Sequence, residues 1–156
     1  MTDEPILLAD QQGGVLKLTL NRPKANAFNE ELIQALHEGL RRAEADASVR
    51  CLILTGSGRA FSAGQDVTVL ASGERTSFRR HLERTYNRLV RQMRALEKPI
   101  VGAINGAAAG AGLGIALATD IRIAARSARF VFGFTGIGLT GDSGTSLILP
   151  LLIGLG

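Results

Sequence analysis

The sequence contains no tryptophan, one tyrosine and one cysteine among its 156 residues. A single cysteine cannot form a disulfide within the chain, so a disulfide-stabilised scaffold is excluded. Cys51 lies in a short apolar run, where we expect a small buried side chain and not a reactive thiol. With so few aromatic residues, basic side chains are not interleaved with the rings that stack on bases, and we expect no nucleic-acid partner.

Long runs of large apolar side chains are also missing. Residues 99–119 carry no charge, but glycine and alanine dominate them and Asn105 interrupts them, which argues against a membrane span. The acidic N-terminus has no basic segment followed by an apolar core, so we expect no secretory signal and a cytoplasmic location. No His, Cys, Asp or Glu cluster has the spacing of metal ligands, and we expect no metal.

The formal net charge of +4 raises the question of a polyanionic partner. Basic residues are concentrated in residues 75–98, along one expected helix. Two interpretations stay open for them. They form either a solvated helix face or a set of contacts to the phosphates of a small ligand.

The first third of the chain predicts a β-α-β unit within one domain over residues 1–156. Hydrophobic residues make up 46% of the sequence, enough for a packed core. Residues 15–20 alternate between apolar and polar, which predicts a strand. Asn29 then precedes two acidic residues and an apolar pattern at helical spacing, which predicts a helix. Residues 50–55 form a short apolar run typical of a buried strand, and a crossover helix allows the two strands to be parallel.

The rest of the chain repeats strand, turn and helix, which predicts a layered α/β spiral. We expect residues 67–76 to be loop-like or partly helical, a long helix over 77–96, a strand over 100–104, a helix over 112–119, strands over 121–124 and 128–132, a loop over 136–142 and a helix over 143–153. The last of these is apolar enough to be packed into protein. Because the apolar segment runs to the end of the chain, we expect Leu147 to Leu155 to need a partner chain for burial.

Residues 102–114 contain five glycines and five alanines, and they lie between an expected strand and an expected helix. Side chains are so small here that backbone amides at the helix start can approach a ligand. The spacing lacks the last glycine of the dinucleotide motif, and no Gly-Lys-Ser/Thr follows, so neither nucleotide loop is predicted. If a second amide from residues 61–66 faces this turn, the two form an oxyanion hole. The alternative is that the glycines only permit close packing of helix and sheet.

Four motifs in a fixed order cover nearly the whole chain: residues 21–29 (NRPKANAFN), 60–66 (AFSAGQD), 98–106 (KPIVGAING) and 119–124 (TDIRIA). Together they resemble the enoyl-CoA hydratase/isomerase, or crotonase, superfamily. The resemblance implies an α/β fold of the ClpP/crotonase type, a spiral of β-β-α turns. It also implies an acyl-CoA thioester as substrate, no cofactor beyond the coenzyme A of that substrate, and assembly into a homo-trimer or hexamer.

The resemblance assigns roles to individual positions. The backbone amides of Gln65 and Ala111 would bind the thioester oxygen and polarise the carbonyl towards an enolate. Contacts to coenzyme A would come from Lys24, Ala25, Ala63, Gly64, Asp66, Val67 and Gly110. Lys24 is the candidate for a coenzyme A phosphate, with a solvated lysine as the alternative.

Two departures from the family pattern bear on the reaction. Hydratases of the family carry two glutamates where this chain has Gly114 and, in our alignment, Phe134, so alkene hydration is disfavoured. Asp142 remains, at the position where isomerases, including ring-epoxide isomerases of phenylacetyl-CoA breakdown, place an acid/base aspartate. Dehalogenases of 4-chlorobenzoyl-CoA place a nucleophile there. Asp142 also fits as a helix N-cap, so three roles stay open.

Members of this superfamily usually continue through further C-terminal helices that complete the pocket, so we expect residues 1–156 to be a crotonase-like core domain truncated at its C-terminal end. His37 and His81 fall on expected polar helix faces away from the motifs, and we expect both at the surface. We therefore expect an acyl-CoA isomerase in which Asp142 moves a proton on a thioester enolate. The alternatives are a hydratase or dehalogenase of the same family, or a catalytically silent acyl-CoA-binding subunit.

Overall fold

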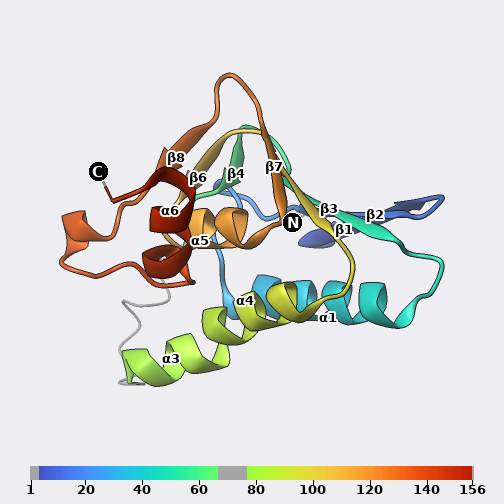
Figure 1. Cartoon of the computed structure of the whole chain (residues 1–156), viewed down its shortest axis with the longest axis horizontal. Coiled ribbons are helices and arrows are strands. Elements are labelled where there is room, and N and C mark those ends of the chain that lie inside the picture. Colours follow the sequence, from blue (N-terminus) through green and yellow to red (C-terminus); the bar gives the residue numbers. More distant parts are fainter. Residues whose placement is uncertain (1–3, 67–76, 156) are drawn as a thin grey trace.

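The computed structural model describes residues 4–66 and 77–155 of the chain (Figure 1). Its elements, in chain order, are β1 (Leu7–Gln12), β2 (Val15–Leu20), α1 (Glu30–Ala45), β3 (Cys51–Gly56), β4 (Ala60–Ser62), α3 (Phe78–Arg84), α4 (Tyr86–Ala95), β5 (Ile100–Ile104), β6 (Ala107–Ala109), α5 (Ala111–Ala118), β7 (Ile121–Ala124), β8 (Arg129–Val131), a 3-10 turn (Thr135–Ile137) and α6 (Thr145–Ile153). The predicted β-α-β opening is confirmed, with β2 and β3 parallel on either side of α1 in the sequence.

The strands form two sheets that the chain visits in alternation. The larger sheet has the order β1-β2-β3-β5-β7 and is parallel except for the antiparallel pair β1–β2. The smaller sheet has the order β4-β6-β8 and is parallel throughout. Each of β3, β5 and β7 is followed by a strand of the smaller sheet and then by helix. This is the β-β-α spiral of the crotonase fold, as predicted.

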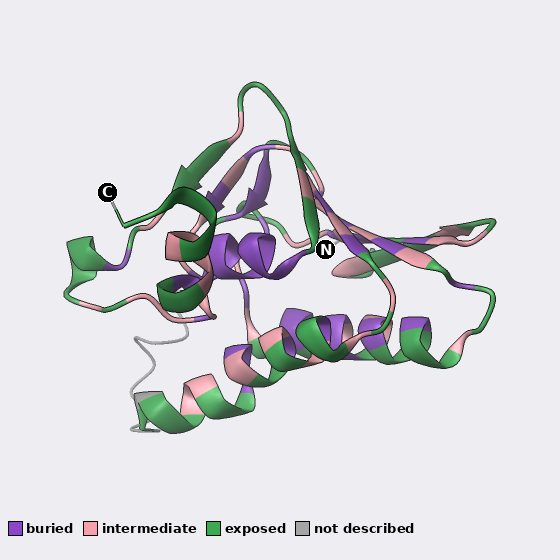
Figure 2. Ribbon diagram, viewed as in Figure 1, coloured by how far each residue is buried: buried purple, intermediate pink, exposed green. Residues whose placement is uncertain are grey.

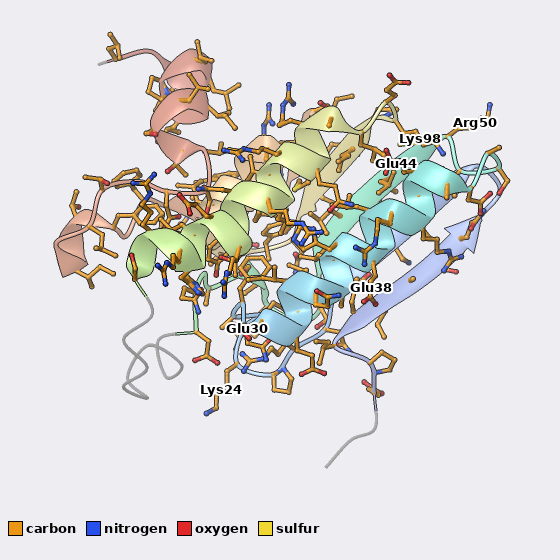
Figure 3. The ribbon with its side chains drawn as sticks, turned by 90° about the horizontal axis from the view of Figure 1, so that it is seen from below. Lys24, Glu30, Glu38, Glu44, Arg50 and Lys98 are labelled. Atoms are coloured by element: carbon orange, nitrogen blue, oxygen red, sulfur yellow. The ribbon has the colours of Figure 1, made fainter. Side chains whose placement is uncertain are left out.

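Helix α1 lies along one face of the larger sheet, next to α4 (Figure 1). Asn29 begins it as predicted, because the Asn29 side chain accepts a hydrogen bond of 2.9 Å from the amide of Leu32. Its apolar stripe, from Leu32 to Leu40, is buried in the core, while Glu30, Glu38 and Glu44 are exposed. Lys98 lies beside the end of the helix (Figure 3) and donates to the carbonyl of Asp46 at 2.8 Å. A cation there stabilises the helix C-terminus.

Helix α5 is buried along its whole length (Figure 2), and its small residues allow this. A Cβ added at Gly112 would lie 2.7 Å from the carbonyl oxygen of Ser62 in β4. Gly110, in contrast, has no atom within 4 Å of such a Cβ and has a φ of +51°. Close packing therefore explains Gly112, whereas Gly110 is needed for a backbone turn that L residues rarely adopt.

Several predicted elements differ from those observed. The helix predicted over residues 77–96 is two helices, because the chain breaks at Thr85, whose ψ is −96°. Strands β1, β4 and β6 were not predicted. The prediction for residues 67–76 lies outside the described residues.

Helix α6 is present as predicted, but in this chain its apolar side chains are exposed, including Leu147 at 67% and Leu151 at 76%. That a partner chain buries them stays a prediction. Among the described helices, none has both the length and the apolar character that a bilayer crossing requires.

Candidate active site

The first wall of the site is the backbone that follows β4. Phe28 and Gln65 form an isolated parallel bridge. The amide of Phe28 donates to the carbonyl of Gly64 at 2.7 Å, and the amide of Asp66 donates to the carbonyl of Phe28 at 2.9 Å. Successive amides of an extended chain point to opposite sides, so the amide of Gln65 points away from Phe28.

The second wall is the start of α5. Gly110 precedes this helix, and its amide donates to the carbonyl of Val131 in β8 at 3.0 Å. Ala111 is the first helical residue, and amides of a first turn have no partner within their own helix. The amide of Ala111 is therefore a donor directed out of the helix start.

The register of the smaller sheet places the segments that carry these two amides next to each other. Ser62 of β4 is paired with Ala108 of β6, and Gln65 and Ala111 each lie three residues further on. The segments touch at Gly64, where an added Cβ would lie 3.3 Å from the amide nitrogen of Ala111 and 2.7 Å from the carbonyl oxygen of Ala109. Since Gly64 also has a φ of +91°, a side chain there is excluded on two counts.

One cavity of about 170 Å³ adjoins both walls. It is lined by Ala63, Gln65, His81, Leu82, Tyr86, Ala109, Gly110, Ala111, Gly133, Phe134, Ile137, Leu139 and Asp142. The structure therefore brings together Gln65, Ala111 and Asp142, which sequence reasoning assigned to catalysis, with Ala63 and Gly110 from the predicted substrate contacts. Most of the remaining wall is apolar.

Asp142 is half-buried at the edge of this cavity, and its carboxylate accepts a hydrogen bond of 2.7 Å from the Ser143 hydroxyl. Burial raises the pKa of Asp142 above its usual value, while the Ser143 hydroxyl and the nearby His81 ring oppose the rise. The N-cap alternative is wrong. Gly144 is the N-cap of α6, and Thr145 donates through its amide (2.9 Å) and hydroxyl (2.6 Å) to the backbone carbonyl of Asp142. The carboxylate is thus not used to begin the helix.

The two positions that the resemblance aligns with hydratase glutamates, Gly114 and Phe134, carry no carboxylate. Gly114 packs so closely that an added Cβ would lie 2.4 Å from the Cβ of Ser143. Phe134 is buried and lines the cavity, and its ring packs edge-on against Phe132 with centroids 5.0 Å apart. Among the described residues that line this cavity, Asp142 is therefore the only one with a carboxylate.

The two histidines lie elsewhere than predicted. His37 is 4% exposed, and its Nδ1 lies 2.5 Å from Oε1 of Gln92, in the layer between α1 and α4. His81 is half-buried and lines the cavity, with its Nε2 3.2 Å from Oε1 of Gln65. The surface prediction is wrong for His37 because its position lies within the buried stripe of α1, beside Leu36 and Leu40. It is wrong for His81 because a helical pattern drawn through residues 77–96 ignores the break at Thr85.

Tyr86, which sequence reasoning did not assign to the site, also lines the cavity. It is 1% exposed, and its hydroxyl donates to Oε1 of Gln65. Burial and the negative charges of Asp142 and Asp66 raise the pKa of Tyr86 above its usual value, so the hydroxyl stays protonated as a donor. A signal was available, since Tyr86 shares the buried stripe of α4 with Leu89 and Met93.

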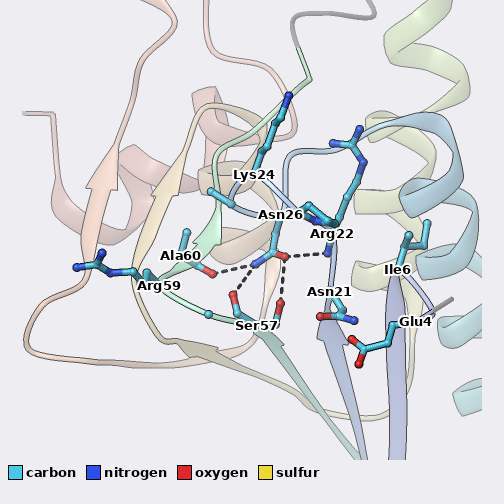
Figure 4. Close-up of a pocket in the computed structure, with 12 residues that line it drawn as sticks. Glu4, Ile6, Asn21, Arg22, Lys24, Asn26, Ser57, Arg59 and Ala60 are labelled. Carbon is cyan, nitrogen blue, oxygen red and sulfur yellow. Dashed lines mark hydrogen bonds between the residues drawn. The ribbon is translucent and has the colours of Figure 1, made fainter. Parts of the chain in front are cut away.

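The predicted coenzyme A contacts Lys24 and Ala25 lie beside a second, open cavity of about 530 Å³. Lys24, Ala25 and Asn26 have φ of 62°, 64° and 55°, a left-handed turn. Asn26 holds this turn from inside (Figure 4): its side chain accepts from the amide of Arg22 and donates to the carbonyls of Ser57 and Ala60, each at 3.0 Å. The Lys24 side chain extends away from Asn26 (Figure 4).

This turn is joined to the first wall. The amide of Ala63 donates to the carbonyl of Ala25 at 2.9 Å. Asp66, another predicted contact, is paired through its carboxylate with Arg22 at 2.7 Å. Val67 lies outside the described residues.

The arginines of α3 and α4 are all exposed, as a solvated helix face predicts, and none of them lines the cavity: Arg79, Arg80, Arg84, Arg88, Arg91 and Arg94. Across residues 4–66 and 77–155, no three His, Cys, Asp or Glu side chains are grouped to hold a metal ion.

Comparison with known proteins decides the family. The family model described as enoyl-CoA hydratase/isomerase matches residues 10–155. The chain belongs to this family. The enoyl-CoA hydratase from Bacillus anthracis has a TM-score of 0.91 and 33% identity to this family member, covering 97% of this chain and 60% of that one.

Two curated relatives bear on the chemistry. The 1,2-epoxyphenylacetyl-CoA isomerase of Escherichia coli K12 is 47% identical over 152 residues, which are 95% of this chain and 58% of the relative. The 4-chlorobenzoyl coenzyme A dehalogenase-2 of an Arthrobacter species is 35% identical over 145 residues, 90% of this chain and 52% of the relative. This member of the enoyl-CoA hydratase/isomerase family thus spans somewhat more than half the length of the curated relatives that it matches.

Proposed function

We propose that this protein isomerises an acyl-CoA thioester, with the amides of Gln65 and Ala111 binding the thioester oxygen and Asp142 moving a proton. The observation that carries the proposal is that all three residues line one cavity of about 170 Å³. The 47% identity to an isomerase that acts on a CoA ester supports the same reaction class.

The chemistry follows from the position of the donors. Two amides at the thioester oxygen stabilise the negative charge that develops there when a proton leaves the α-carbon. The Asp142 carboxylate takes that proton, and the resulting acid returns it to another carbon of the enolate, so a double bond shifts and no atom is gained or lost. A pKa raised by burial makes the carboxylate a stronger base than an exposed aspartate, as the first step requires.

Hydration fits the site less well than isomerisation. Adding water to an alkene in this family uses two carboxylates, whereas Gly114 has no room for a side chain and Phe134 is a hydrocarbon wall. A second candidate is nucleophilic attack by Asp142 on an aromatic ring, which the 35% identity to a dehalogenase favours. The third is a silent acyl-CoA-binding subunit.

The wall of the cavity indicates the acyl group. Leu82, Phe134, Ile137 and Leu139 form an apolar lining, which suits an aromatic acyl group of the phenylacetate type or a fatty acyl chain. Coenzyme A would extend past Ala63, Gly64 and Gly110 towards Asp66, Val67 and the turn of Lys24 and Ala25. A trimer or hexamer is the proposed assembly, and the exposed apolar side chains of α6 support it.

A panel of CoA thioesters tests the proposal, with double-bond shift, hydration and dehalogenation measured for the parent protein and for Asp142→Asn. We expect Asp142→Asn to bind the esters as the parent does and to lose isomerisation. An unchanged isomerisation rate would remove Asp142 from the reaction. A covalent adduct in the intact mass of the parent would favour the nucleophilic role, and binding without turnover in the parent would favour the silent subunit.

A further inference from the structure

We propose that Tyr86 and His81 are positioning residues, which hold the Gln65 side chain and thereby fix the backbone amide of Gln65 at the thioester oxygen. The inference rests on the proposed function of that amide. It extends the site to two residues of the α3–α4 segment that act through Gln65.

Both residues bond the same atom. Oε1 of Gln65 accepts from the Tyr86 hydroxyl and lies 3.2 Å from Nε2 of His81. An amide oxygen can only accept, so Nε2 of His81 must carry a proton in this contact. The other end of the side chain, Nε2 of Gln65, donates to the carbonyl of Asp66 at 3.4 Å. The Gln65 side chain is therefore held at both ends.

The Tyr86 side chain, which holds Gln65, is itself fixed by packing. The Tyr86 ring is 1% exposed and packs edge-on against Phe28, with centroids 5.9 Å apart. Phe28 is also the residue whose backbone bonds the carbonyl of Gly64 and the amide of Asp66. These contacts link Phe28, Tyr86 and Gln65 in a closed ring. The Gln65 peptide is therefore held both through its neighbouring backbone groups and through its own side chain.

The break between α3 and α4 makes this arrangement possible. On a continuous helix, residues five apart project about 140° from each other, so His81 and Tyr86 could not face one oxygen. At Thr85 the chain leaves helical geometry, with φ −108° and ψ −96°, and the Thr85 hydroxyl donates to the carbonyl of His81 at 2.6 Å. The rings of His81 and Tyr86 then lie edge-on with centroids 6.1 Å apart.

A held amide matters because a donor stabilises the oxyanion only from a fixed position, and small displacements are costly. Without the two donors, the Gln65 peptide can turn away from the thioester oxygen. The expected effect is a loss of about tenfold in kcat with KM nearly unchanged, since the contact strengthens as charge develops.

The test compares Tyr86→Phe, Gln65→Met and the double variant. Gln65→Met keeps the backbone amide and removes the acceptor, and Tyr86→Phe keeps the ring and removes the donor. The readouts are kcat, KM and the 13C chemical shift of the carbonyl carbon in bound 13C-labelled butyryl-CoA, which reports polarisation without turnover. We expect both single variants to reduce the shift caused by binding, and the double variant to lose no more than either single one.

His81→Gln and His81→Leu test the second donor, with His37→Leu as the matched control because His37 is also a helix histidine beside a glutamine oxygen but does not line the cavity. We expect the glutamine variant to keep the carbonyl shift, the leucine variant at His81 to reduce it, and the variant at His37 to leave it unchanged.

The outcomes separate this inference from the proposed function. A carbonyl shift in the parent that is unchanged in Tyr86→Phe, or strictly additive losses in the double variant, would overturn the inference alone. Retained isomerisation in Asp142→Asn would overturn the proton transfer and leave the inference standing. A parent protein that binds butyryl-CoA with no change in its carbonyl shift would overturn both.

Discussion

Ser143 occupies the space beside Gly114, so closely that its Cβ lies 2.4 Å and its carbonyl oxygen 2.7 Å from where a Gly114 side chain would begin. Ser143 also has a φ of +52°, in the left-handed region that L residues rarely adopt. By resemblance, hydratases of the family carry a glutamate at this position, and here the turn that contains Asp142 and Ser143 fills the space.

Gly114→Ala should therefore displace Asp142, although Gly114 itself does not line the cavity. The added methyl group must displace Ser143, and with it Asp142, so we expect a loss of about 1–3 kcal/mol in the free energy of unfolding and a lower isomerisation rate. Urea unfolding and the steady-state rate measure the two effects. Gly136→Ala is the control, because no atom lies within 4 Å of its added Cβ and its φ is not positive. Equal stability of the two variants would contradict the close packing of α5 on the Asp142 turn.

The pH dependence of stability should reveal the burial of Asp142. Its pKa is raised in the folded protein, so the neutral form is favoured on folding. This contribution to stability is complete below the unfolded pKa of about 3.9 and is lost as the pH rises through the higher folded pKa. We expect Asp142→Asn to remove this loss and to be the more stable protein near about pH 7, measured by urea unfolding across the range. A parent and variant with parallel pH profiles would show that Asp142 is not desolvated.

The ion pair between Arg22 and Asp66 should anchor the left-handed turn of residues 24–26, where the proposed function expects coenzyme A. Its atoms are 2.7 Å apart with side chains 22% and 14% exposed, and Arg22 also donates to the carbonyl of Ala27 at 3.0 Å. We expect Arg22→Gln to cost about 1.5–3 kcal/mol of unfolding free energy and to raise the KM for acyl-CoA esters. Arg79→Gln removes an exposed pair with Glu83 and should change neither quantity appreciably. Similar effects of both variants would contradict a special role for the Arg22 pair.

Local patterns predicted the elements that carry a signal in their own sequence. The Asn29 cap, the apolar stripe of α1 and the apolar runs of β3 and β5 all carry their own signal, and all are present. Strand β6 does not, because Ala107–Ala109 has low strand propensity and exists through its ladders to β4 and β8. The pairing that sets the segments of Gln65 and Ala111 side by side was therefore visible only through resemblance.

The polar contacts of Gln65 were hidden for a different reason. His81 and Tyr86 stand at a spacing that belongs to opposite faces of a regular helix, and only the break at Thr85 turns both towards Gln65. A helix break without proline or glycine has no sequence signal of its own, since Thr85 is compatible with a helix interior. Tertiary contacts decided this geometry, and sequence patterns do not record them.

The alternation of the chain between two sheets has a consequence for how the family can diversify. Both amide donors leave the same edge of neighbouring strands, three residues past one paired position, whereas Leu82, Ile137 and Leu139 reach the cavity from separate excursions of the chain. Substitutions in those segments would change the shape of the cavity for an acyl tail without altering the paired strands β4 and β6. If the proposed function holds, carbonyl activation and tail preference therefore belong to different pieces of the polypeptide, and one can drift while the other is kept.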